Sequence, residues 1–200
     1  TMYTWIWRHF SLSIPDDWEM VRFSRKFSRG VCAFADRYQV RFEFHWREVS
    51  GPPDFDRMLG DYISQLESED RVSGKPERLR SGDWHGFRAA LNDGTMTSRF
   101  GRYFKRSSCL IEAVFIWPSG TVDPEIESEM LRSVRQEEAG SDGLIRWRAL
   151  GMDLLASQEL TLVECVAKPA YAKIRFGDPK NPNVDQCFER LGMLDSWLDE

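Results

Sequence analysis

Residues 40–47 alternate strictly between apolar and polar side chains, and this alternation constrains the fold more than any other feature of the chain. The apolar positions are Val40, Phe42, Phe44 and Trp46. The polar positions between them are Arg41, Glu43, His45 and Arg47. Successive side chains of a β-strand point to opposite faces of the sheet. The segment therefore predicts a strand of an antiparallel sheet with one dry face and one wet face.

The segment 109–117, CLIEAVFIW, has no wet face, because Glu112 is its one charged residue. It predicts a central strand that is covered on both sides. Alternating patterns predict further strands at 10–14, 18–23, 77–91 and 95–117. The pair Asp93-Gly94 is typical of the tight turn of a hairpin between the last two of these segments.

Two helices are predicted between the strands. Asp54 can cap the first, over residues 54–69, because its carboxylate accepts a free backbone N–H of the first turn. Its apolar stripe has helical spacing and consists of Phe55, Met58, Leu59, Tyr62, Ile63 and Leu66. Asp123-Pro124 predicts the start of the second helix. We expect one core made of Phe42, Phe44, Trp46, Phe55, Leu59, Tyr62, Ile111 and Phe115.

A short phrase, Trp-Arg followed by alternating apolar residues, occurs twice, at Trp7 and at Trp147. Cys32 and Cys165 are separated by the same number of residues as Phe55 and Phe188. This spacing indicates an internal duplication; the alternative is chance similarity between two amphipathic segments. The hypothesis predicts a complete α+β unit at 1–139 and a partial second unit at 144–200, made of strands and a helix over 184–198.

The opening segment FSLSIPDDWE resembles the start of Mog1/PsbP-like domains, in which an amphipathic strand ends in Ile-Pro and precedes a Trp and a short return strand. The resemblance covers roughly residues 8–138. It implies an α+β fold, an α/β/α sandwich in which helices pack on an antiparallel sheet. It also implies non-enzymatic roles, chiefly binding to other proteins or assembling with them. No binding residue of that family can be carried over.

The net charge of −5 argues against general attraction to nucleic acids or membranes. No apolar run reaches the roughly 20 residues that span a bilayer, and the N-terminus lacks the basic and apolar pattern of a signal peptide. The cysteines are Cys32, Cys109, Cys165 and Cys187. Because they are scattered, they indicate buried free thiols in a reducing compartment. We therefore expect a cytoplasmic protein.

Catalytic chemistry has weak support in the sequence. Cys32, Asp36 and His45 can be assigned the roles of nucleophile, orienting acid and base, but nothing in their spacing requires it. Cysteines and histidines are not spaced as zinc ligands, and the glycines do not form a phosphate-binding loop. We therefore predict no catalytic residues, no cofactor and no metal.

Basic residues are concentrated between residues 75 and 106, whereas residues 123–142 hold seven acidic residues against two arginines. One interpretation is a docking face for an acidic partner or for a second copy of the chain. That face consists of Arg78, Arg80, Arg99, Arg102, Lys105 and Arg106. The alternative is a solvated strand face whose arginines pair with nearby acids.

Together these observations favour a non-catalytic protein-binding or assembly module, and self-association is expected as a two-fold dimer. The alternative is a small-molecule carrier or an enzyme, with a pocket between the sheet and the 54–69 helix. A pocket of about 300 Å³ or more at that place would favour the alternative.

Overall fold

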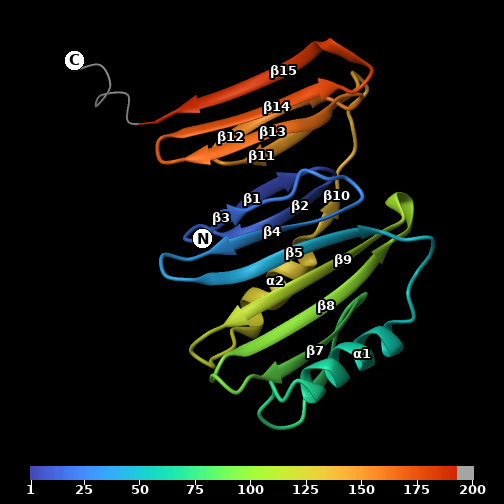
Figure 1. Cartoon of the computed structure of the whole chain (residues 1–200), viewed down its shortest axis with the longest axis vertical. Helices are drawn as coiled ribbons and strands as arrows, with labels where there is room; N and C mark the ends of the chain where they lie inside the picture. The colour runs from blue at the N-terminus through green and yellow to red at the C-terminus, as the bar shows by residue number, and fades with distance from the viewer. Residues whose placement is uncertain (193–200) are drawn as a thin grey trace. The chain divides into compact units, whose positions relative to one another are not determined.

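A computed structural model describes residues 1–192. The chain forms two compact units (Figure 1), and each contains segments that are distant in the sequence. Unit 1 contains Thr1 and residues 14–24 and 28–133, whereas unit 2 contains residues 2–13 and 25–27 and the chain from 134 onward. The structure thus groups residues 2–13 with the C-terminal part of the chain rather than with the rest of 1–139.

Unit 1 is built on a seven-stranded antiparallel sheet, with strand order β3-β4-β5-β9-β8-β7-β6. The strands are β3 (Glu19–Arg22), β4 (Arg29–Ala35), β5 (Val40–Glu48), β6 (Glu77–Ser81), β7 (Trp84–Ala90), β8 (Met96–Phe104) and β9 (Cys109–Trp117). The predicted strands at 40–47 and 109–117 are confirmed, and so is the hairpin across Asp93-Gly94 between β7 and β8.

The pairing of β5 with β9 creates the dry face of this sheet. Phe42 lies opposite Phe115, and Trp46 lies opposite Ile111. Phe44 is 1% exposed, in keeping with the apolar phase of the alternation. The rings of Phe42 and Phe115 are 5.0 Å apart. We call this side of the sheet the α2 face.

Helix α1 (Phe55–Ser68) packs on the opposite side, which we call the α1 face. Asp54 caps it as predicted, because its carboxylate accepts the backbone N–H of Arg57 at 3.1 Å. Leu59 packs with Phe87 and Ala89 of β7, and in Figure 1 the helix runs alongside β7.

Glycine at position 101 of β8 allows the helix to approach the sheet closely. A Cβ atom there would lie 3.1 Å from Phe55 and 3.2 Å from Met58.

The prediction of one core is therefore wrong for the helix. Phe87 pairs with Arg99, and Arg99 pairs with Val114, so these residues share a face that Phe115 does not. Since neighbouring residues of a strand point to opposite sides, Leu59 belongs to a different apolar cluster from Phe115.

Helix α2 (Pro124–Ser133) begins at the predicted cap and is tied to the α2 face through a buried carboxylate. Glu127 is 3% exposed. It accepts hydrogen bonds from Trp117 Nε1 at 2.9 Å and from Arg88 Nη2 at 2.6 Å. A buried ion pair of this kind is costly to break, because removal of one partner leaves an uncompensated charge.

Unit 2 contains two further antiparallel sheets, with strand orders β10-β2-β1-β11-β12 and β13-β14-β15. The five-stranded sheet consists of β1 (Met2–Trp7), β2 (Phe10–Pro15), β10 (Arg135–Gln136), β11 (Leu144–Ala149) and β12 (Met152–Ser157). The three-stranded sheet consists of β13 (Thr161–Lys168), β14 (Tyr171–Asp178) and β15 (Asn181–Leu191). Trp147 and Phe176 join the two sheets, with ring centroids 4.9 Å apart.

The two copies of the Trp-Arg phrase lie side by side in one sheet. Strands β1 and β11 pair antiparallel with Ile6 opposite Arg148, and the rings of Trp7 and Trp147 are 5.2 Å apart. One copy of the phrase runs from the end of β1 into β2, and the other runs from β11 into β12.

The predicted helix over 184–198 is wrong where the structure describes it, and residues 193–198 lie outside the described part. Residues 181–191 form strand β15, in which Phe188 lies opposite Ile174. The matched segment that begins at Phe55 is helical. The two similar sequence segments therefore adopt different secondary structures, and the structure offers no support for a duplication.

The predicted fold class is also wrong, because the chain is mostly antiparallel β-sheet and not an α/β/α sandwich. Within residues 1–192 the α-helices are α1 and α2, of 14 and 10 residues. Such helices are roughly 21 and 15 Å long, whereas seven strands span roughly 33 Å. Each helix can cover only part of a sheet face.

The cysteines are only partly as predicted. Cys32 and Cys109 are buried, but Cys187 is exposed. Burial raises the pKa of the Cys165 thiol to about 12. No helix within the described residues is long and apolar enough to cross a membrane.

We expect Phe44→Ala to lower the free energy of unfolding by about 3–5 kcal/mol, because it leaves a cavity in the dry face. Glu48→Ala is the matched control, since Glu48 is an exposed residue of the same strand. Urea titration of both variants measures the difference. A loss below about 1 kcal/mol for Phe44→Ala would contradict the packing described for this face.

Candidate functional site

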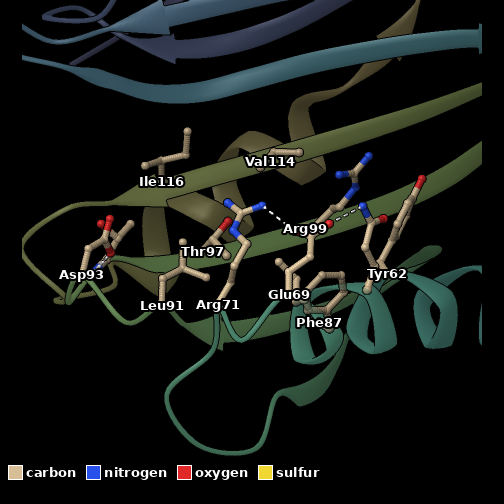
Figure 2. Close-up of a pocket in the computed structure, with 13 residues that line it drawn as sticks. Tyr62, Glu69, Arg71, Phe87, Leu91, Asp93, Thr97, Arg99, Val114 and Ile116 are labelled. Atoms are coloured by element: carbon tan, nitrogen blue, oxygen red, sulfur yellow. Dashed lines mark hydrogen bonds and ion pairs between the residues drawn. The ribbon is translucent and has the colours of Figure 1, made fainter.

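A groove of about 470 Å³ lies on the α1 face of the seven-stranded sheet (Figure 2). One side is α1, and the floor is formed by β7, β8 and β9. We call it the α1 groove. Its lining residues are Tyr62, Gln65, Leu66, Glu69, Arg71, Phe87, Leu91, Asp93, Thr95, Thr97, Arg99, Val114 and Ile116.

The floor of the groove contains apolar residues of the central strand β9 that the helix does not cover. Leu110 and Glu112 of β9 are buried, but Val114 and Ile116 on the same face are only half-buried. The expectation that β9 is covered on both faces therefore fails at these two positions. The helix packs over β7, where Phe87 is 2% exposed, and leaves this end of β9 open to the groove.

The helical side of the groove comes from one stripe of α1. Tyr62, Gln65, Leu66 and Glu69 follow at three, four and seven residues, the spacing of one helical face. The stripe thus changes along its length from an aromatic ring to a carboxylate. Gln65 Nε2 donates to Glu69 Oε1 at 2.9 Å, which holds the carboxylate at the end of the helix.

Arg71 enters the groove from the loop after α1. Its guanidinium extends over the floor in Figure 2, and its Nη1 donates to Glu69 Oε2 at 3.3 Å. The pKa of Glu69 is lowered by its hydrogen bonds from Gln65 and Arg71. The carboxylate is therefore ionised at neutral pH, and Arg71 faces a charged neighbour.

Arg99 lies at the other end of the groove in a more enclosed setting. Its Nε donates to Glu112 Oε1 at 3.0 Å, and its guanidinium is 4.1 Å from the centre of the Tyr62 ring. Burial alone would lower the pKa of Arg99, but the charge of Glu112 raises it. Burial, aided by Glu112, raises the pKa of Tyr62. The three side chains form a closed, mostly structural cluster.

A second polar cluster occupies the same sheet face on β5. His45 Nε2 lies 2.8 Å from Glu43 Oε2, and Arg22 Nη2 donates to Glu43 Oε1 at 3.0 Å. The hydrogen bond from His45 is the largest cause of the lowered pKa of Glu43. No cysteine joins this cluster, because Cys32 pairs with Phe44 and thus faces the other side of the sheet.

The arrangement of Cys32, Asp36 and His45 is therefore not assembled. The carboxylate of Asp36 instead accepts the backbone N–H groups of Tyr38 and Gln39, at 2.8 and 2.9 Å. Among the described residues no group of three or more His, Cys, Asp or Glu side chains is arranged to hold a metal ion.

The six predicted docking residues do not form one surface. Arg78 and Arg80 are exposed on the edge strand β6. Arg99 lies in the groove, and Arg102, three residues along β8, points to the opposite face and pairs with Asp83 at 3.3 Å. Lys105 and Arg106 belong to the short 3₁₀ turn η1 (Lys105–Ser107). The ion pairs of Arg99 and Arg102 agree with the alternative interpretation, arginines neutralised by nearby acids.

Sequence reasoning placed a possible pocket between the sheet and the 54–69 helix, but it missed Arg71 and the open end of β9. The sequence of β9 did contain an indication of this site. A strand that is apolar on both faces must be covered by other elements on both sides, and any part left uncovered is a candidate binding surface. The signal for Arg71 was absent, because its place depends on the loop that returns from α1 to the sheet.

No family model matches the chain, and no curated protein matches it either. Among solved structures, a crystal structure from Bacteroides thetaiotaomicron is similar over 70% of this chain and 50% of that chain, at 16% sequence identity and a TM-score of 0.37. The chain thus spans about half the length of that structure. A similarity this low identifies neither a family nor a function, and the resemblance to Mog1/PsbP-like domains stays a prediction.

We expect Glu43 to contribute to acid stability. Its folded pKa is below the unfolded value of about 4.3, so its ionised form stabilises the folded protein above that pH. This contribution is lost as the pH falls through the lowered folded pKa. Glu43→Gln should therefore lose less stability than wild type on acidification, in urea titrations across this range. Glu48→Gln, an exposed change on the same strand, should follow wild type; the same behaviour in Glu43→Gln would contradict the role of the His45 pair.

Proposed function

We propose that the protein is a non-catalytic binding module and that the α1 groove is its binding site. The observation that carries this proposal is that two apolar residues of β9, Val114 and Ile116, are only half-buried and line the groove. Both residues lie on a central strand, where side chains are normally covered. Covering them would gain roughly 25 cal/mol for each Å² of apolar surface removed from water.

The rim of the groove supports binding rather than catalysis. Arg71 and Glu69 pair with each other, and Asp93 accepts the backbone N–H of Thr95 at 2.9 Å. These side chains can orient a ligand through its polar groups. None of them is next to a nucleophile with an activating base, the arrangement that covalent catalysis requires.

The first candidate ligand is a segment of a protein partner, bound with its side chains on the apolar floor. The open shape of the groove and its charged rim support this, since protein interfaces combine an apolar centre with a polar rim. The second candidate is a small molecule, and the protein would then be a carrier. The volume of about 470 Å³, between the sheet and α1, supports this second function, because small-molecule sites span roughly 300–1,000 Å³.

A neutral apolar dye tests the groove without knowledge of the ligand. We expect Nile red to bind wild type saturably, with increased fluorescence. Ile116→Lys should lower its affinity by about tenfold, because a charge replaces part of the apolar floor. Leu155→Lys is the matched control, since Leu155 is 52% exposed and lies on β12 in unit 2. Equal affinities for the two lysine variants would overturn the groove as the binding site.

We also propose that copies of the chain associate through β15. Within residues 1–192 this strand of 11 residues pairs only with β14, so its outer edge carries unpaired backbone groups. Val184 and Leu191 on it are 44% and 59% exposed. Long exposed edges of this kind favour pairing with another chain, and two-fold symmetry is the commonest form of such assembly.

Sedimentation equilibrium at micromolar concentration should show a dimer. Val184→Lys should shift the equilibrium toward the chain mass of 23.4 kDa, because lysine on an edge strand opposes pairing. Val21→Lys is the matched control, since Val21 is 56% exposed on β3, a different edge strand. A single species at the chain mass for wild type would contradict self-association.

A further inference from the structure

We propose that the α1 groove binds a ligand that combines an apolar body with one carboxylate, and that Arg71 binds the carboxylate. This inference rests on the proposed function, since it names the chemistry of the ligand for the same groove.

The backbone of Arg71 is held firmly at the mouth of the groove. Its N–H donates to the carbonyl of Leu66 at 3.0 Å, and its carbonyl accepts the N–H of Asn92 at 3.0 Å. The next residue, Val72, forms a β-bridge with Leu91 of the sheet. The side chain therefore starts from a fixed point between α1 and the sheet, and a ligand can find it in a reproducible place.

The guanidinium of Arg71 has remaining capacity for a ligand. It offers five N–H donors, and within residues 1–192 the structure shows it bonded to Glu69 alone, at 3.3 Å. The side chains of this pair are 57% and 41% exposed. An exposed pair of this kind contributes little to stability, because water and salt screen its charges. A ligand carboxylate that forms two parallel hydrogen bonds with the guanidinium can therefore compete with Glu69.

Arg99 is not suited to the same task. Glu112 already binds it at 3.0 Å, and the Tyr62 ring covers it at 4.1 Å. Glu112 is itself 7% exposed, so its carboxylate cannot turn away into water at low cost. Arg99 therefore completes the end of the groove, and Arg71 remains as the anion-binding residue.

The acidic residues of the groove limit the ligand to a single carboxylate. Glu69 and Asp93 both line the groove, and hydrogen bonds to each lower its pKa, so both are ionised at neutral pH. Asp93 is engaged by the backbone of its own turn, whereas Glu69 competes directly for Arg71. The Glu69 carboxylate repels a ligand carboxylate that binds to Arg71 beside it, so removal of the Glu69 charge should strengthen binding.

The apolar body of the ligand lies on the apolar floor of the groove, next to the carboxylate that Arg71 binds. Val114 and Ile116 provide this floor from β9, and Leu66 and Leu91 flank it. In Figure 2, Ile116 and Leu91 lie to the left of the Arg71 guanidinium, one above the other. A ligand anchored by its carboxylate at Arg71 thus has an apolar surface within reach.

Isothermal titration calorimetry with octanoate and with octanol separates the contribution of the carboxylate to binding from that of the apolar chain. We expect wild type to bind octanoate about tenfold more tightly than octanol, the value of one charge-assisted hydrogen-bonded pair. Arg71→Gln should remove this preference and leave octanol binding unchanged. Glu69→Gln should tighten octanoate binding but not octanol binding. Arg78→Gln, an exposed change outside the groove, is the matched control. Circular dichroism checks that each variant is folded.

A second pair of ligands identifies the source of the carboxylate. A short peptide that ends in leucine is compared as its free acid and as its C-terminal amide. A preference for the free acid that Arg71→Gln abolishes supports a protein C-terminus as the ligand. Octanoate binding without peptide binding supports a free apolar acid. Both outcomes support the carboxylate proposal.

Two results would overturn the proposal, and they differ in what they say about the groove. If wild type binds Nile red at the groove but shows no preference for octanoate or for the free-acid peptide, the carboxylate inference is wrong and the proposed function stands. The same conclusion follows if Arg71→Gln retains the preference. If neither Nile red nor any of these ligands is sensitive to Ile116→Lys, both proposals are wrong.

Discussion

The antiparallel pairing of β5 with β9 is the interaction on which unit 1 depends. It places Phe42 against Phe115 and Trp46 against Ile111, and so closes one face of the seven-stranded sheet with large buried side chains. The same register places Glu43 beside Val114 and His45 beside Glu112 on the other face. A shift of one residue would exchange these two sets. The dry face and the polar face are thus two consequences of one register.

The groove follows from how the other face is covered. Helix α1 approaches β8 at Gly101 and packs its apolar stripe on β7. It is too narrow to reach across the whole sheet. Polar clusters cover the β5 side, where charged side chains are stable in water, but Val114 and Ile116 lie between the two regions. The apolar floor is therefore left partly uncovered because the sheet is wider than the helix. A ligand that covered it would remove apolar surface from water, which is why we propose binding at this place.

Unit 2 reaches stability by a different route. Its two sheets meet through aromatic rings, with Trp147 in contact with both Trp7 and Phe176. The N-terminal strand β1 completes this unit although it begins the chain, because it pairs antiparallel with β11. The sequence similarity between the two Trp-Arg phrases lies within one sheet. It is not evidence for a repeated unit, since the matched segments farther along differ in secondary structure.

Local sequence determined the strands at 40–47 and 109–117, the capped helix at Asp54 and the start of α2 at Asp123-Pro124. Each of these depends on residues close in the chain, through alternation, helical spacing or a capping hydrogen bond. Only the tertiary structure decided that α1 packs on the face opposite Phe115, that residues 181–191 pair with β14 as a strand, and that Arg71 reaches the open end of β9. These features depend on strand register and on contacts between distant segments. A periodic pattern shows that one face of an element is apolar, but it does not show which surface that face meets.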